Sequence, residues 1–134
     1  MRGQSAFELA MLLALNLVLF FLFLVAIVPV EDRILFERKQ VLAKEILLTA
    51  SSEINSAAII GDGYARRFTV PERLRDNTNF SLNIDPYIQR LTIYWGESEG
   101  SYGINILTSN VSGEFSHGPH LIRNVAGTVV IEAA

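Results

Sequence analysis

The run of apolar residues from Leu9 to Val30 constrains this chain more than any other feature. It provides the roughly 20 residues that an α-helix needs to cross the hydrocarbon core of a bilayer, and Asn16 is its only strongly polar side chain. A core helix of a soluble protein would carry a polar stripe at the helical period, and this run carries none. We therefore expect a helix that is surrounded on all sides by lipid or by a tightly packed helical bundle.

The residues on either side of this run show what kind of segment it is. A secretory signal peptide has an apolar core of about 7 to 15 residues, followed by a cleavage site made of small residues. Here the apolar run is longer, and the charged residues Glu31-Asp32-Arg33 follow it. Before the run stand Arg2-Gly3 and then Gln4, Glu8 and Leu12 at a spacing of four. The N-terminus is therefore not a secretory signal of the usual kind.

This arrangement resembles the archaeal type IV pilin-like proteins with a class III signal peptide. In that family a basic residue and a glycine precede the pattern Gln-x-Ser-x-Glu-x-x-x-Leu and an apolar helix. Gln4, Glu8 and Leu12 match the pattern. Ala6 departs from it, because the family usually has serine there, and Ser5 lies one position early.

The resemblance implies that a prepilin peptidase cuts between Gly3 and Gln4 and removes residues 1–3 as a leader. It also implies that Glu8 meets the new N-terminal amine of a neighbouring subunit during assembly, which would neutralise both charges. A carboxylate at the edge of the hydrocarbon is costly and usually has a partner or a function. Alternatively, Glu8 lies in the headgroup region and favours the helix N-terminus electrostatically, and both roles can hold together.

The pattern predicts that the helix continues to about residue 60, with the hydrophobic span at 9–30 as the first part of a helix over 4–60. Pro29 should kink this helix rather than end it, because no Gly or Pro occurs from Glu31 to Ile60. Apolar residues recur there at Ile34, Leu35, Val41, Leu42, Leu48 and Ile54. We expect the far half of this stripe to pack on the C-terminal head and the near half on neighbouring subunits. An equal alternative is that residues 46–60 fold back on their own head with no partner.

A β-rich head is expected over residues 61–134. Gly61-Asp62-Gly63 can close the last helical turn, and the sequence then alternates short apolar segments with turn residues. The expected strands are 64–70, 80–84, 90–95, 102–108, 121–125 and 127–134, with the first and fifth less regular. The predicted fold class is therefore α+β: a long N-terminal helix, transmembrane and then amphipathic, packed on a small head of four or five antiparallel strands in hairpin order.

Composition excludes several classes of function. A chain of 134 residues with a net charge of −3 and scattered basic residues has room for one span and one small domain, and nothing in it suggests nucleic-acid binding. The absence of cysteine excludes disulfides and thiol chemistry. His117 and His120 lack the spacing of a metalloprotease motif and are expected to be loop residues, with adventitious metal binding as the alternative. Asp62 and Asp85 occupy expected turns. We expect neither an enzyme nor a bound cofactor or metal.

Two sequons are present, Asn79-Phe80-Ser81 and Asn110-Val111-Ser112. Each predicts a surface position at which asparagine-linked sugar can be attached if the head lies outside the membrane. The charges that flank the span oppose that orientation. Arg2 and the amine precede it, whereas four basic residues follow it between positions 33 and 44, against the positive-inside rule.

Two hypotheses about function follow. The first is a structural subunit of an archaeal surface filament, with the helices in the core, the heads outside and adhesion as its purpose, as the resemblance implies. Its partners would be copies of itself, the membrane before assembly, the prepilin peptidase and the assembly machinery. The second is an uncleaved, membrane-anchored accessory or binding protein of the cell envelope.

Overall fold

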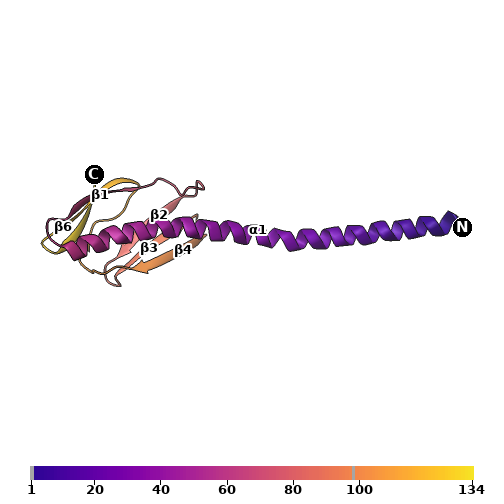
Figure 1. Ribbon diagram of the computed structural model, residues 1–134, viewed down its shortest axis with the longest axis horizontal. Helices are drawn as coiled ribbons and strands as arrows, with labels where there is room; N and C mark the ends of the chain where they lie inside the picture. Colours follow the sequence, from indigo (N-terminus) through magenta and orange to yellow (C-terminus); the bar gives the residue numbers. More distant parts are fainter. Residues whose placement is uncertain (1, 98) are drawn as a thin grey trace. The chain divides into compact units, whose positions relative to one another are not determined.

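The fold of the chain is α+β, as predicted. The computed structural model describes residues 2–97 and 99–134, with one long helix, α1 (Arg2–Ile60), followed by a set of short strands (Figure 1). The chain divides into two compact units, Met1–Glu37 and Arg38–Ala134. The first unit consists of helix alone in its described part, and the second contains the end of α1 and every described strand.

Helix α1 continues through Pro29 and ends at Ile60, which confirms the predicted continuation and end of the helix. Gly61 has φ +83° and Gly63 has φ +91°, a left-handed conformation that is unfavourable for residues with a Cβ atom. The Gly61 amide donates to the Ala57 carbonyl oxygen at 3.1 Å and so satisfies one of the last carbonyl groups. The glycines thus let the chain leave the helix and turn into the head.

The face of α1 that the head covers differs from the predicted stripe. The buried positions are Ala43, Leu47, Ala50, Ile54 and Ala57, spaced alternately four and three residues apart. Such spacing places all five on one side of a helix. Of the predicted stripe, Ile54 is buried and Leu42 is partly buried, whereas Ile34, Leu35, Val41 and Leu48 are exposed. Three of the five buried positions are alanines, so small side chains make up much of this face.

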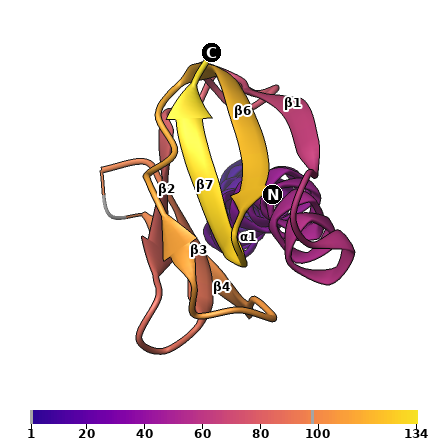
Figure 2. The same cartoon turned by 90° about the vertical axis from the view of Figure 1, so that its left-hand side faces the viewer.

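The strands form two sheets rather than one sheet in hairpin order. They are β1 (Ala65–Val70), β2 (Phe80–Asp85), β3 (Arg90–Trp95), β4 (Gly100–Asn105), β5 (Val111–Ser112), β6 (Gly118–Val125) and β7 (Thr128–Ala133). One sheet has the order β1-β6-β7-β5 and the other the order β2-β3-β4 (Figure 2). The short β5 pairs with β7 in parallel, while the remaining pairs are antiparallel. The expected hairpin order therefore holds for β2-β3-β4 and for β6-β7, but not for β1, which pairs with β6.

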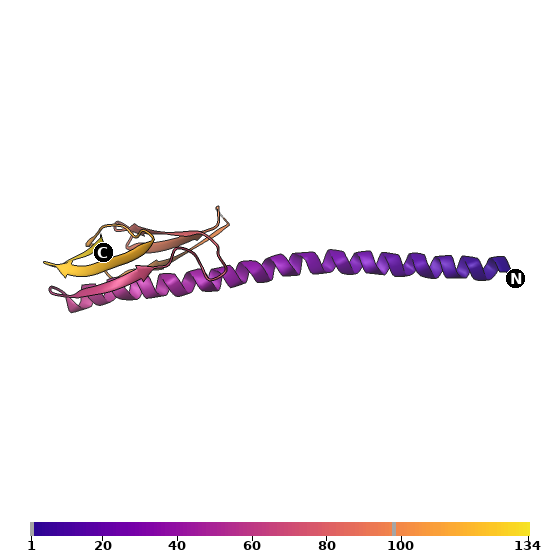
Figure 3. The same cartoon turned by 90° about the horizontal axis from the view of Figure 1, so that it is seen from above.

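A single apolar core joins the end of α1 to the inner faces of both sheets. Alternation along the strands supplies it, because successive side chains point to opposite faces. In β3, for example, Leu91, Ile93 and Trp95 are buried while Arg90 and Tyr94 are exposed. In Figure 3, β1 runs beside the end of α1, and the other strands lie behind it. The packing explains why a head this small is stable: the helix covers sheet surface that would otherwise face water.

Asn124 ties the end of the helix to the head. Its side chain is buried, its Nδ2 donates to the Ala57 carbonyl oxygen at 2.9 Å, and its Oδ1 accepts the Gly127 amide at 3.0 Å. The backbone amide of Asn124 donates to the Tyr64 carbonyl oxygen at 2.9 Å. One side chain on β6 therefore gives the Ala57 carbonyl oxygen a second donor beside the Gly61 amide and also pairs a turn amide.

Candidate functional site

The first candidate site is the apolar surface of α1, which the described chain leaves uncovered. The helix is long and apolar enough to cross a membrane by length and composition, and the most apolar part of it has no buried residue. Every side chain from Leu9 to Val30 is exposed except Ile27, which is partly exposed. Isolated exposed apolar residues are ordinary, but a continuous exposed surface of this kind marks a membrane or protein interaction site.

The residues predicted for processing and assembly lie at the start of this surface. Gly3, Gln4 and Glu8 are all helical and exposed, whereas Met1 of the expected leader lies outside the described residues. Glu8 shares a shallow depression with Met11, Leu12 and Leu15, at spacings that place them on one helix face. Its carboxylate is thus set in an apolar surface. Cleavage after Gly3 and a role of Glu8 in assembly stay predictions.

The apolar surface extends past the span. Ile34, Leu35, Val41 and Leu48 expose between 44% and 67% of their surface. These are the large apolar residues of the predicted amphipathic stripe, so the head does not use them for its own core. Of the predicted stripe, Ile54 and in part Leu42 pack on the head. The four exposed side chains remain available to another partner.

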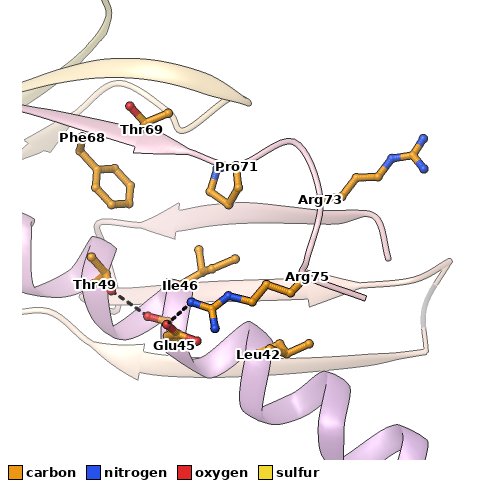
Figure 4. Close-up of a pocket in the computed structure, with 9 residues that line it drawn as sticks. All are labelled: Leu42, Glu45, Ile46, Thr49, Phe68, Thr69, Pro71, Arg73 and Arg75. Atoms are coloured by element: carbon orange, nitrogen blue, oxygen red, sulfur yellow. Dashed lines mark hydrogen bonds and ion pairs between the residues drawn. The ribbon is translucent and has the colours of Figure 1, made fainter. Parts of the chain in front are cut away.

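The second candidate site is a groove beside the end of α1. Its lining residues come from the helix, from β1 and from the loop that follows β1, and they are Leu42, Glu45, Ile46, Thr49, Phe68, Thr69, Pro71, Arg73 and Arg75 (Figure 4). Its volume is about 260 Å³. We call it the Phe68 groove. Sequence patterns could not predict it, because its walls come from segments that are about 20 to 30 residues apart.

The rim of the Phe68 groove is charged. Arg75 contacts Glu45 across the groove, with Nη2 to Oε1 at 3.2 Å, and both side chains are mostly exposed. Arg73 donates from Nη1 to the Asn77 Oδ1 at 3.0 Å. Asn77 is a neutral partner, so the positive charge of Arg73 is not compensated by that contact. The groove therefore combines apolar walls from Leu42, Ile46 and Phe68 with a rim of net positive charge.

A third polar cluster links α1 to β1. Tyr64 Oη donates to the Glu53 Oε2 at 2.9 Å, and Arg66 Nη1 lies 3.2 Å from the Glu53 Oε1. Burial, followed by the hydrogen bond and the negative charge of Glu53, raises the pKa of the Tyr64 phenol above its ordinary value. Its contacts join α1 to the start of β1, so we assign the cluster to the attachment of β1 to the helix.

This cluster predicts an alkaline dependence of stability. Because the folded state raises the pKa of Tyr64, its contribution is complete below the ordinary tyrosine pKa of about 10 and is lost as the pH rises through the folded value. Tyr64→Phe should therefore flatten the decline of unfolding free energy above pH ~10. Urea unfolding followed by Trp95 fluorescence measures it, with the exposed Tyr87→Phe as the control. Equal pH slopes in the two variants would contradict the assignment.

The two histidines are structural. His120 lies in β6, not in a loop as predicted, and is 1% exposed. Its Nε2 accepts the Ser116 amide at 3.1 Å, so its Nδ1 carries the proton and donates to the Gly118 carbonyl oxygen at 3.0 Å. His117 lies in the loop, as predicted, with its Nδ1 3.0 Å from the Pro71 carbonyl oxygen. Both nitrogens of His120 are thus used to hold the loop before β6.

The remaining predicted positions are turns and sequons. Asp85 Oδ1 accepts the amides of Tyr87 and Ile88 and so serves a local turn, as predicted. Asp62 lies in a turn, but its Oδ1 accepts the amide of Ala126, so its hydrogen bond is long-range rather than local. Asn79 and Asn110 are exposed, which is the surface position that the sequons require. Within residues 2–97 and 99–134, no group of three or more His, Cys, Asp or Glu side chains could hold a metal ion.

Comparison with known proteins does not assign the chain to a family. No protein-family model matches the sequence, and neither a curated protein nor a solved structure similar to the chain was found. The fold defines the class: an α+β protein in which a long apolar N-terminal helix continues into the core of a small antiparallel head. This architecture is compatible with that of type IV pilins.

Proposed function

We propose that this chain is a structural subunit of an archaeal type IV pilus-like surface filament. In this proposal the peptidase removes residues 1–3, the apolar helices pack together as the filament core, and the heads form the outer surface that adheres. The observation that carries the proposal is the uncovered apolar surface of α1, which extends past the hydrophobic span to Val41 and Leu48. Lipid can cover the span, whereas the later residues require protein, as in a bundle of neighbouring helices.

Two further observations support this proposal. The start of the helix carries the motif residues Gln4, Glu8 and Leu12 on one exposed helix. Both sequon asparagines are exposed on the head, where sugar would not interfere with its core. The alternative, an uncleaved anchor of an envelope-binding protein, explains the span but leaves Val41 and Leu48 without a covering partner.

The test is the intact mass and N-terminal sequence of the chain from sheared cell-surface material. A chain that starts at Gln4 and is recovered in filaments is the expected result, because cleavage and assembly are coupled in this proposal. A chain that starts at Met1 and occurs only in membranes would refute the filament and favour the anchored protein.

A variant of Gly3 tests the cleavage directly. Gly3→Phe should abolish processing, because a large side chain would stand beside the bond that the peptidase cuts. The fold should be unaffected, since Gly3 has nothing within 4 Å of the position of an added Cβ atom. Arg2→Lys, which keeps the basic residue, is the control. Normal cleavage of Gly3→Phe would count against the signal-peptide assignment.

A further inference from the structure

The turn between β2 and β3 presents an apolar knob. Tyr87 is 98% exposed and Ile88 is 62% exposed, and Tyr87 is the most exposed large apolar side chain among the described residues. Asp85 Oδ1 accepts the amides of Tyr87 at 3.0 Å and Ile88 at 3.3 Å, which fixes the turn locally. An aromatic ring held outward on a fixed turn binds with little loss of conformational entropy, so it suits insertion into a partner. We call residues 85–89 the Tyr87 turn.

The Phe68 groove has the size of a site for one large side chain. Its volume of about 260 Å³ is below the roughly 300–1,000 Å³ typical of pockets for small molecules. Leu42, Ile46 and Phe68 offer apolar contacts to such a side chain. A single tyrosine side chain from a turn fits this combination of size, apolar walls and charged rim better than a cofactor does.

The charges of the two surfaces are complementary. Arg73, Arg75 and Glu45 line the groove and leave a net positive charge, because Arg73 donates to the neutral amide of Asn77 rather than to a carboxylate. The Tyr87 turn carries the carboxylate of Asp85. Opposite charges on the rims of two apolar surfaces favour one register of docking over others.

The Tyr87 turn and the Phe68 groove cannot contact each other within one head. The loop with Arg73 and Arg75 precedes the first residue of β2, and the Tyr87 turn follows its last residue (Figure 1). A strand of six residues separates them by about 20 Å. A contact between two different surfaces of the same protein is a head-to-tail contact. It produces a ring if the rotation between copies closes, and an open filament if it does not.

We propose that the Tyr87 turn of one copy inserts into the Phe68 groove of the next copy, with Asp85 facing Arg73. This inference rests on the proposed function, because a filament is what brings the heads of successive copies together. It assigns the head a second role beside adhesion: it sets the register between neighbouring subunits.

The test is disulfide cross-linking in cells that express the full chain, which contains no native cysteine. The variant carries Tyr87→Cys together with Thr49→Cys, an exposed residue whose side chain lies on the helix wall of the groove (Figure 4). Oxidation should give a ladder of dimers, trimers and larger species on a non-reducing gel, because each copy carries both halves of the contact. Asp85→Asn keeps an oxygen that can accept the turn amides and removes the charge, so adding it should reduce the ladder about two- to fivefold.

The controls separate this contact from crowding in the membrane. Each single cysteine variant should give no ladder, and neither should Thr49→Cys with Leu107→Cys, an exposed residue elsewhere on the head. Monomers from the Tyr87–Thr49 pair would overturn the inference and leave the groove to another ligand, even if sheared filaments are still recovered. A ladder in membranes without filaments would support the contact while refuting the filament, so the two proposals fail separately.

Discussion

Asn124→Ala is expected to destabilise the head by about 1–3 kcal/mol. The variant removes the hydrogen bond from Nδ2 to the Ala57 carbonyl oxygen and the one from the Gly127 amide to Oδ1, and each hydrogen bond contributes about 0.5–1.5 kcal/mol net. Asn124 is 4% exposed, so the truncation also leaves a gap inside the head. The loss should also loosen the end of α1, because Ala57 belongs to the buried seam of the helix.

The measurement is urea unfolding of the full chain in detergent, followed by the fluorescence of Trp95. Trp95 is the only tryptophan in the chain and is 1% exposed in the core of the head, so its emission reports unfolding of that core. The matched control is Asn83→Ala, which truncates the same side chain at an exposed strand position and should change stability by less than about 0.5 kcal/mol. Equal effects of the two variants would mean that Asn124 does not anchor the helix.

Local pattern predicted the elements of this fold well. The strands at 80–84 and 90–95 were found because apolar and polar residues alternate there, and β3 does bury Leu91, Ile93 and Trp95. The helix end was found because two glycines occur together after a long run without breakers. These features depend only on residues that are close in sequence, so a local sequence pattern is enough to predict them.

Pairing between distant segments could not be predicted in the same way. Strand β1 pairs with β6 more than 50 residues later, and β5 adds only Val111 and Ser112 to the edge of the sheet. Nothing local distinguishes these partners from others of equal apolar character. The covered face of the helix was predicted wrongly because the prediction considered only large apolar side chains, whereas Ala43 and Ala50 are among the buried residues.

The same difference between local patterns and long-range contacts applies to the candidate sites. The apolar span and the exposed sequons follow from composition and short motifs, and both could be predicted. The Phe68 groove and the anchoring role of Asn124 depend on contacts across 30 or more residues, such as Arg75 with Glu45 and Asn124 with Ala57.

Glu8→Leu is expected to leave membrane insertion intact and to reduce filament yield by a factor of about 100 or more. In the proposed assembly the carboxylate of Glu8 meets the N-terminal amine of a neighbouring copy as the helices leave the lipid. Removing one partner of a desolvated ion pair costs about 3–5 kcal/mol, because the other charge stays buried without compensation, and 3 kcal/mol is already a factor of about 100. Insertion should not suffer, since leucine is more favourable than glutamate in hydrocarbon.

The position of Glu8 makes the experiment discriminating. Its neighbours Met11, Leu12 and Leu15 are apolar and exposed, so leucine at position 8 extends their surface without disturbing any described contact. Glu31→Leu, which removes an equally exposed carboxylate just after the span, is the matched control and should leave filament yield unchanged. Quantifying the chain in membranes and in sheared material separates insertion from assembly. Normal filaments from Glu8→Leu would show that assembly does not need the carboxylate. Its role would then be limited to a favourable interaction with the helix N-terminus.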